Sequence, residues 1–139
     1  MVKMIKSCKI YLKIKENAIV NITEKVQKFV DESNIKDGVV MIFTKGSTSA
    51  VTTIEYEPNL VKDFLDCLEK IAPMDADYEH HKTWGDRNGA SHLRASLIGP
   101  SLAVPIENGQ LVLGTWQQIV VCNFDRCKRE REVRLYFIR

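Results

Sequence analysis

The segment Ser101-Leu-Ala-Val-Pro-Ile-Glu-Asn-Gly-Gln-Leu-Val-Leu113 places two apolar runs on either side of an Asn-Gly pair. Asn108 and Gly109 readily adopt the positive φ angles that tight hairpin turns require, so the segment predicts an antiparallel hairpin. Two further apolar runs, 118–122 and 133–138, predict strands that follow it. The C-terminal part of the chain is therefore expected to form antiparallel sheet.

The N-terminal part of the chain predicts two main helices. Apolar residues recur at helical spacing in 22–30 and in 60–71, and the second pattern follows Pro58, which suits the first turn of a helix. Alternating or β-branched runs at 10–14, 39–43 and 50–54 predict strands. Helices early and antiparallel strands late favour an α+β fold over a doubly wound one. Nothing resembling a linker divides residues 1–139, so we expect a single domain.

Composition and charge narrow the class of protein. The 139 residues are 45% hydrophobic and 27% charged, which is ordinary for one soluble domain. A net charge of +2 is too mild to indicate a nucleic-acid surface, and the charged run 128–134 alternates in sign, as in the solvated part of a hairpin. No apolar run approaches the roughly 20 residues that span a bilayer. We therefore expect a cytoplasmic protein without nucleic-acid or membrane partners.

The stretch from Tyr78 to Leu93 contains all three histidines of the chain. His80, Asp86 and His92 are evenly spaced in it, and imidazole and carboxylate groups suit a metal site or an acid–base site. The spacing matches no compact zinc signature, so the ligands would have to converge through loop geometry. The alternative is a polar surface loop between two helical segments. A short helix closed by a glycine is one interpretation of the residues after this stretch, 93–98.

Hydroxyl groups gather in the turn 44–49. Ser47 and Thr48, with Lys45 beside them, could accept phosphate or carboxylate oxygens, although the turn is not a Walker loop. A Ser/Thr-rich connection is also commonly a simple turn. The function of this turn therefore stays open on the residues alone.

Two other segments carry polar groups at unusual places. Gly114-Thr-Trp-Gln-Gln118 interrupts a strand pattern, and the amide of Gln117 could orient a ligand or a subunit interface. The alternative has Trp116 packed in the core and the glutamines in solvent. Glu55 and Glu57 would lie on one side of a strand, where two like charges call for a cation or for solvent.

Several short motifs occur together in a characteristic order. They are Ser47-Thr-Ser-Ala50, Tyr78-Glu-His80, Asp86, Ser91-His-Leu93, Ala95-Ser-Leu-Ile-Gly-Pro-Ser101 and Leu113-Gly-Thr-Trp-Gln-Gln118. In combination they resemble the YjbQ family, also called the UPF0047 or secondary thiamine-phosphate synthase family. The resemblance extends over nearly the entire chain.

The resemblance implies a fold, an assembly and an activity. The expected fold packs antiparallel β-sheets as a sandwich with two main helices, and three copies form a homotrimer with a polar pocket near the subunit boundaries. The implied activity is that of a transferase, which couples an aminopyrimidine diphosphate to a thiazole phosphate and releases pyrophosphate. A small phosphorylated metabolite is the expected partner.

The resemblance also implies roles for individual residues. It makes His92 and Asp86 catalytic candidates, and His80, Asp86 and His92 candidate ligands of a divalent metal ion. The candidate substrate-binding residues are Ser47, Thr48, Arg94 and Gln117.

One departure from the family pattern favours a second function. Many relatives carry a histidine where this chain has Ser47, and a serine hydroxyl cannot replace imidazole as a neutral nitrogen ligand. The alternative to an enzyme is thus a non-catalytic trimeric protein that binds a metabolite or a metal. Metal-dependent hydrolysis ranks below both, because nothing in the sequence selects a bond to be cleaved.

Overall fold

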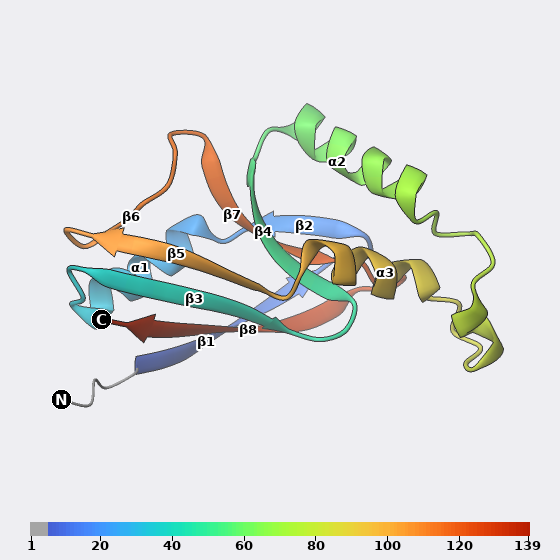
Figure 1. The fold of residues 1–139 in the computed structure, drawn as a ribbon, viewed down its shortest axis with the longest axis horizontal. Coiled ribbons are helices and arrows are strands. Elements are labelled where there is room, and N and C mark those ends of the chain that lie inside the picture. The colour runs from blue at the N-terminus through green and yellow to red at the C-terminus, as the bar shows by residue number, and fades with distance from the viewer. Residues whose placement is uncertain (1–5) are drawn as a thin grey trace.

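Two antiparallel sheets face each other in the computed structural model, which describes residues 6–139 (Figure 1). The five-stranded sheet has the order β1-β8-β3-β5-β6, and the three-stranded sheet has the order β2-β7-β4. The strands are β1 (Lys6–Ile14), β2 (Ala18–Asn21), β3 (Gly38–Lys45), β4 (Ser49–Glu55), β5 (Ser101–Glu107), β6 (Gln110–Leu111), β7 (Gln117–Asn123) and β8 (Arg129–Ile138). The predicted α+β fold with antiparallel sheets is confirmed.

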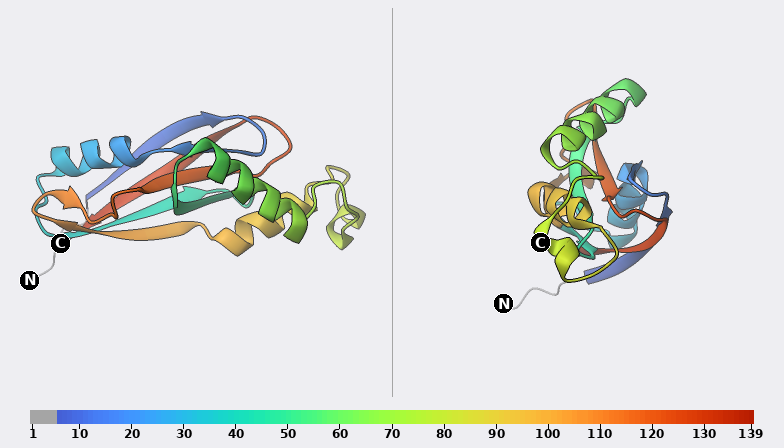
Figure 2. Two further views of the ribbon diagram at one scale, coloured as in Figure 1. Left: turned by 90° about the horizontal axis from the view of Figure 1, so that it is seen from above. Right: turned by 90° about the vertical axis from the view of Figure 1, so that its right-hand side faces the viewer.

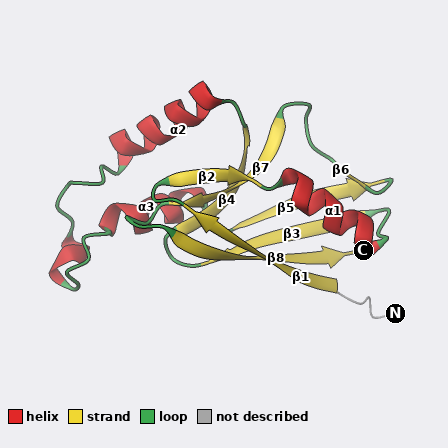
Figure 3. Cartoon of the chain, turned by 180° about the vertical axis from the view of Figure 1, so that it is seen from behind, coloured by secondary structure: helices red, strands yellow, loops and turns green. Residues whose placement is uncertain are grey.

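The main core lies between the two sheets. Alternate residues of β8 point inward, so Val133 and Leu135 are fully buried and meet Ile119 and Val121 of β7. Helix α1 (Thr23–Ser33) adds its apolar face, including Val26, to this core. Figure 3 shows α1 near one end of the sandwich and α3 (Gly89–Ile98) near the other.

A second, smaller core lies on the outer face of the three-stranded sheet. Helix α2 (Pro58–Ile71) contributes Leu68 and α3 contributes Ala95, and these side chains meet Val120 and Cys122 of β7. The short 3-10 helix η1 (Glu79–Lys82) connects the two helices and projects from one end of the molecule (Figure 2). No helix within residues 6–139 combines the length and hydropathy needed to cross a membrane.

The local predictions have mixed outcomes. The Asn-Gly hairpin is confirmed, because Asn108 and Gly109 have φ angles of 51° and 76° between β5 and β6. The helix closed by a glycine is also confirmed, although it begins at Gly89. The hairpin expected around 128–134 is wrong, because β7 and β8 lie in different sheets and most of the charged run belongs to β8.

Arg131, from this charged run, is buried between the sheets. Its Nη2 donates hydrogen bonds to Thr48 Oγ1 at 2.7 Å and to Asn123 Oδ1 at 2.5 Å. The Asn123 amide in turn donates to the backbone carbonyls of Ile14, Lys15 and Cys127. Burial lowers the pKa of the Arg131 guanidinium from its usual value, and the nearby Asp125 carboxylate opposes that shift. This polar network joins β1, the β3–β4 turn and the β7–β8 connection.

Asp125 is the acidic member of this network. Burial by itself raises the pKa of its carboxyl group, but hydrogen bonds from the Arg126 amide and the Arg129 side chain outweigh burial and hold the pKa below 3.8. The Asp125–Arg129 contact measures 2.7 Å. The buried positive charge therefore lies beside a carboxylate that stays ionised in the folded protein.

We predict that Arg131→Met lowers the free energy of unfolding by about 3 kcal/mol, because the substitution leaves buried acceptors without a donor. Urea unfolding followed by circular dichroism measures the change. Arg126→Met is the matched control, since the Arg126 side chain is 39% exposed and pairs with the exposed Asp75, so its loss should cost no more than about 1 kcal/mol. Equal losses in the two variants would show that Arg131 does not stabilise the fold in this way.

The low pKa of Asp125 gives stability a defined pH dependence. A carboxyl group that binds protons more weakly in the folded than in the unfolded chain stabilises the protein above its unfolded pKa, and this contribution is lost as the pH falls through the folded pKa. Wild-type protein should therefore lose more free energy of unfolding than Asp125→Asn as the pH falls below 3.8. Urea titrations from about pH 5 to pH 2 measure both slopes. Identical slopes would contradict the assignment.

Candidate functional site

Two of the predicted site histidines lie against each other at one end of the molecule. The rings of His80, in η1, and His92, in the first turns of α3, have centroids 4.8 Å apart and meet edge to face at 71°. Both side chains are partly exposed. The structure therefore brings together two imidazoles that the sequence places on separate elements.

Packing of η1 against the start of α3 places these rings. The Gly89 amide donates a hydrogen bond to His81 Nε2 at 3.0 Å, and the His81 ring meets the Tyr78 ring edge to face. A Cβ atom at Gly89 would lie only 2.8 Å from Tyr78 Cβ, so glycine is required for this contact. Tyr78 is itself held by a 2.6 Å bond from its hydroxyl to the Pro73 carbonyl. His81 therefore anchors the segment that carries His80.

The N-terminus of α3 has unpaired polar groups around it. Asn88 occupies the N-cap position without a side-chain capping bond, and its Oδ1 is buried without a partner. Ser91 Oγ and His81 Nδ1 are also buried without a partner. The first turn of a helix carries exposed amide dipoles that favour negative charge. Ser91 Oγ can donate a hydrogen bond to an anionic group, whereas Asn88 Oδ1 can only accept one, and both atoms are buried. Of the side chains at this end of α3, the partly exposed His92 is the one that a ligand can reach.

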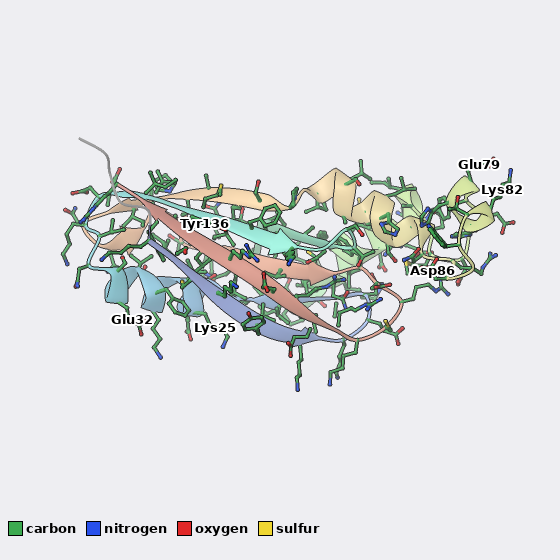
Figure 4. All side chains as sticks on the ribbon, turned by 90° about the horizontal axis from the view of Figure 1, so that it is seen from below. Lys25, Glu32, Glu79, Lys82, Asp86 and Tyr136 are labelled. Atoms are coloured by element: carbon green, nitrogen blue, oxygen red, sulfur yellow. The ribbon has the colours of Figure 1, made fainter. Side chains whose placement is uncertain are left out.

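Asp86 lies in the exposed loop between η1 and α3. Figure 4 shows it at the same end of the molecule as Glu79 and Lys82 of η1. Within residues 6–139, no group of three or more His, Cys, Asp or Glu side chains is arranged to hold a metal ion. Catalytic zinc sites use three protein ligands, and one chain supplies only the two adjacent imidazoles. The residues present in a single chain do not by themselves fit such a centre.

The turn 44–49, which carries the hydroxyl groups, is held in place by hydrogen bonds from Arg131. Thr48 is buried, and its Oγ1 accepts the bond from Arg131 and lies 3.5 Å from Asp125 Oδ2. Ser47 is exposed at the tip of the turn. Thr48 therefore holds the turn in place, while Ser47 is the member of the pair that faces solvent.

Arg94 and Gln117 have partners within the chain. Arg94 is fully buried and donates hydrogen bonds to the Ala72 carbonyl at 3.0 Å, to Asn17 Oδ1 at 3.0 Å and to Glu69 Oε2 at 2.5 Å. Gln117 bonds to the Gly114 amide and to Thr53 Oγ1. These contacts tie α3 to the end of α2 and brace the loop before β7. The guanidinium of Arg94 is enclosed and has partners within the chain, and its expected role in substrate binding stays a prediction.

Sequence reasoning missed Asn88 and Ser91 as site residues. The expected helix began at Leu93, whereas α3 begins at Gly89. Asparagine is one of the residues preferred at the N-cap of a helix, and Asn88 directly precedes α3. The glycine at position 89 obscured this signal, because glycine usually indicates the end of a helix or a loop.

Comparison with known proteins gives a consistent result. The family model described as UPF0047 protein YjbQ-like matches residues 9–139. A UPF0047 protein of Archaeoglobus fulgidus is 37% identical over 115 residues, which cover 83% of this chain and 87% of that protein. A UPF0047 protein of Methanothermobacter thermautotrophicus is 39% identical over 117 residues, covering 84% of this chain and 80% of that protein.

Solved structures share the fold. An uncharacterized conserved protein of the YjbQ/UPF0047 family from Clostridium acetobutylicum is similar with a TM-score of 0.86 at 37% identity, covering 94% of this chain and 99% of that chain. A YbjQ-like protein of unknown function from Sulfolobus solfataricus also gives a TM-score of 0.86, at 28% identity, covering 97% of this chain and 99% of that chain. The family match, the sequence identities and the shared fold together show that this protein belongs to the YjbQ/UPF0047 family.

Proposed function

We propose that the protein binds a small phosphorylated metabolite at the His80–His92 pair and carries a thiamine-phosphate synthase-type transferase activity. The adjacent imidazoles beside the N-terminus of α3 are the observation that supports this proposal most strongly. Imidazole as a class changes charge near neutral pH, and helix N-termini favour phosphate oxygens. The choice of substrates rests on the family resemblance.

The proposed reaction forms one bond and breaks another. The ring nitrogen of the thiazole phosphate attacks the methylene carbon of the aminopyrimidine diphosphate, so that a C–N bond forms as the C–O bond to the diphosphate breaks. Pyrophosphate leaves with the electron pair, and the ring nitrogen acquires the positive charge. The protein would position the two reactants and neutralise the charge that develops on the departing oxygens.

The residues of the candidate site have different roles in the proposed reaction. His92 donates a hydrogen bond or a proton to the leaving diphosphate, and His80 packs against its ring and holds it in place. Asp86, in the loop between them, stays a candidate for orienting an imidazole or a cation. Ser47 stays a candidate phosphate contact from the exposed turn. Thr48, Arg94 and Gln117 are left out of the proposed contacts, because their polar groups already have partners.

We further propose that three copies assemble as a homotrimer. Large apolar side chains are exposed on the described chain, including Ile71 at 60% and Leu97 at 61%. Ile71 also lines an apolar groove of about 350 Å³ between α2 and β4, together with Ile54 and Phe64. Contiguous exposed apolar surface is typical of protein interfaces. A second subunit seated there would bury this surface.

A second candidate function is binding of a metabolite or divalent metal without catalysis. Two adjacent imidazole nitrogens are ligands of the kind that zinc and other transition metals prefer. A third ligand would have to come from Asp86 after a change in its loop, or from another subunit. Ser47 stands where the family resemblance implies a histidine in many relatives, which favours binding without catalysis but removes one possible nitrogen ligand for a metal.

His92→Ala should abolish most of the transferase activity, with a loss of at least about 100-fold in kcat, because it removes the proposed proton donor. Product formation from the two phosphorylated precursors measures the loss. Glu79→Gln is the matched control, since Glu79 is an exposed residue of the same segment, and it should retain activity. Both variants should keep the wild-type mass of three times 15.9 kDa in light scattering. Full activity in His92→Ala would contradict the catalytic proposal, and a monomeric wild type would contradict the trimer.

Zinc titration tests whether the histidine pair is a metal site. If the histidine pair is a metal site, calorimetric titration of the wild type with Zn²⁺ should show saturable binding that weakens by at least about 10-fold in His80→Ala. Asp86→Asn should weaken it similarly if Asp86 supplies the third ligand. Equal titration curves for wild type and His80→Ala would exclude the pair as a metal site and leave the metal-free proposal.

A further inference from the structure

An open cleft lies where β4 ends, α2 begins and β7 begins. Its volume is about 370 Å³, and its lining includes Tyr56, Trp116, Glu55, Glu57, Asn21 and Gln118. Figure 1 shows these elements along the top of the molecule, away from η1 at its right-hand end. Within one chain, the cleft is therefore separate from the histidine pair.

Two aromatic rings line this cleft and remain open to solvent. Trp116 is 71% exposed and Tyr56 is 44% exposed. The alternative in which Trp116 packs in the core is therefore wrong. An exposed indole face carries negative π-electron density, which attracts a cation that comes within about 6 Å of the ring. The rings thus offer a flat apolar surface with a preference for positive charge.

The carboxylates of the cleft add negative charge beside these rings. Glu57 accepts hydrogen bonds from the Asn59 and Leu60 amides at the N-terminus of α2, which fixes its position and partly offsets its charge. Glu55, at the end of β4, forms none of the ion pairs found in residues 6–139. Glu55 is therefore the main carboxylate without a compensating partner in the cleft.

The polar groups around the cleft are held in place before any ligand binds. Asn21 Nδ2 donates to Gln118 Oε1 at 3.1 Å, and this pairing joins β2 to β7. Gln117 bonds to both the Gly114 amide and Thr53 Oγ1, so the loop that carries Trp116 is braced against β4. A preformed site loses less conformational entropy on binding than a mobile one.

We propose that this cleft binds a flat organic cation, namely a nitrogen heterocycle with a quaternary or protonated ring nitrogen. The ring stacks on Trp116, and its positive charge lies towards Glu55. Tyr56 forms a second apolar wall of the cleft. Gln118 can donate hydrogen bonds from its amide nitrogen to polar substituents of the ligand. This class includes the product of the proposed transferase, whose ring nitrogen carries a positive charge, but the inference rests on the side chains of the cleft and does not depend on that function.

The test uses 1-methylnicotinamide chloride as the cationic probe and nicotinamide as its neutral counterpart. Titrations follow the two indole N–H signals of the protein by NMR, with Trp116→Phe assigning them. Trp84 is the matched internal control, since it is 63% exposed but lies outside the cleft lining. The Trp116 signal should shift saturably with the cation, whereas the Trp84 signal should not. Nicotinamide should bind at least about fivefold more weakly.

Two variants complete the experiment. Glu55→Gln should weaken binding of 1-methylnicotinamide by about two- to fivefold and reduce its dependence on salt. His92→Ala should leave the binding unchanged, so that failure of the transferase proposal and failure of this one are distinguishable. Linear shifts of both indole signals, equal affinity for nicotinamide, or unchanged affinity in Glu55→Gln would each overturn the proposal.

Discussion

Strand β7 is buried on both faces, and this burial determines how the other layers of the molecule are arranged. Ile119 and Val121 point into the core between the sheets, while Val120 and Cys122 point to the helices on the other side. A strand buried on both faces must be covered by a layer on each side, and the continuous apolar run of β7 meets that requirement. The five-stranded sheet supplies one layer, and α2 and α3 supply the other. The position of the histidine pair follows from this packing, because α3 carries His92.

The candidate site is held by close ring packing. Gly89 lets the Tyr78 ring approach the start of α3, and the Gly89 amide then orients His81. The neighbouring His80 is thereby directed to His92. A larger side chain at position 89 would separate η1 from α3, so the geometry of the two imidazoles depends on a residue that carries no functional group. Arg94 also holds α3 in position, because its hydrogen bonds tie this helix to the end of α2.

Two surfaces of different chemistry result from this arrangement. The histidine pair offers two partly exposed imidazoles, which can donate hydrogen bonds to an anion. The cleft beside Trp116 and Glu55 combines aromatic faces with negative charge, and it suits a cation.

Most strands, the two main helices, the Asn-Gly hairpin and the motifs of the family could be predicted from the sequence, because each depends on residues close together in the chain. Strand β2 was not predicted. Which charged groups are buried depends on contacts between distant elements, and these contacts could be identified only in the tertiary structure. Arg131 belongs to a run of alternating charges typical of a solvated segment, yet its hydrogen-bond partner Thr48 lies 83 residues away in sequence. The meeting of His80 and His92, and the enclosure of Arg94, likewise depend on contacts between elements. Hydrophobic periodicity reports only which face of an element is buried, whereas the partners of a polar side chain are set by how the elements pack.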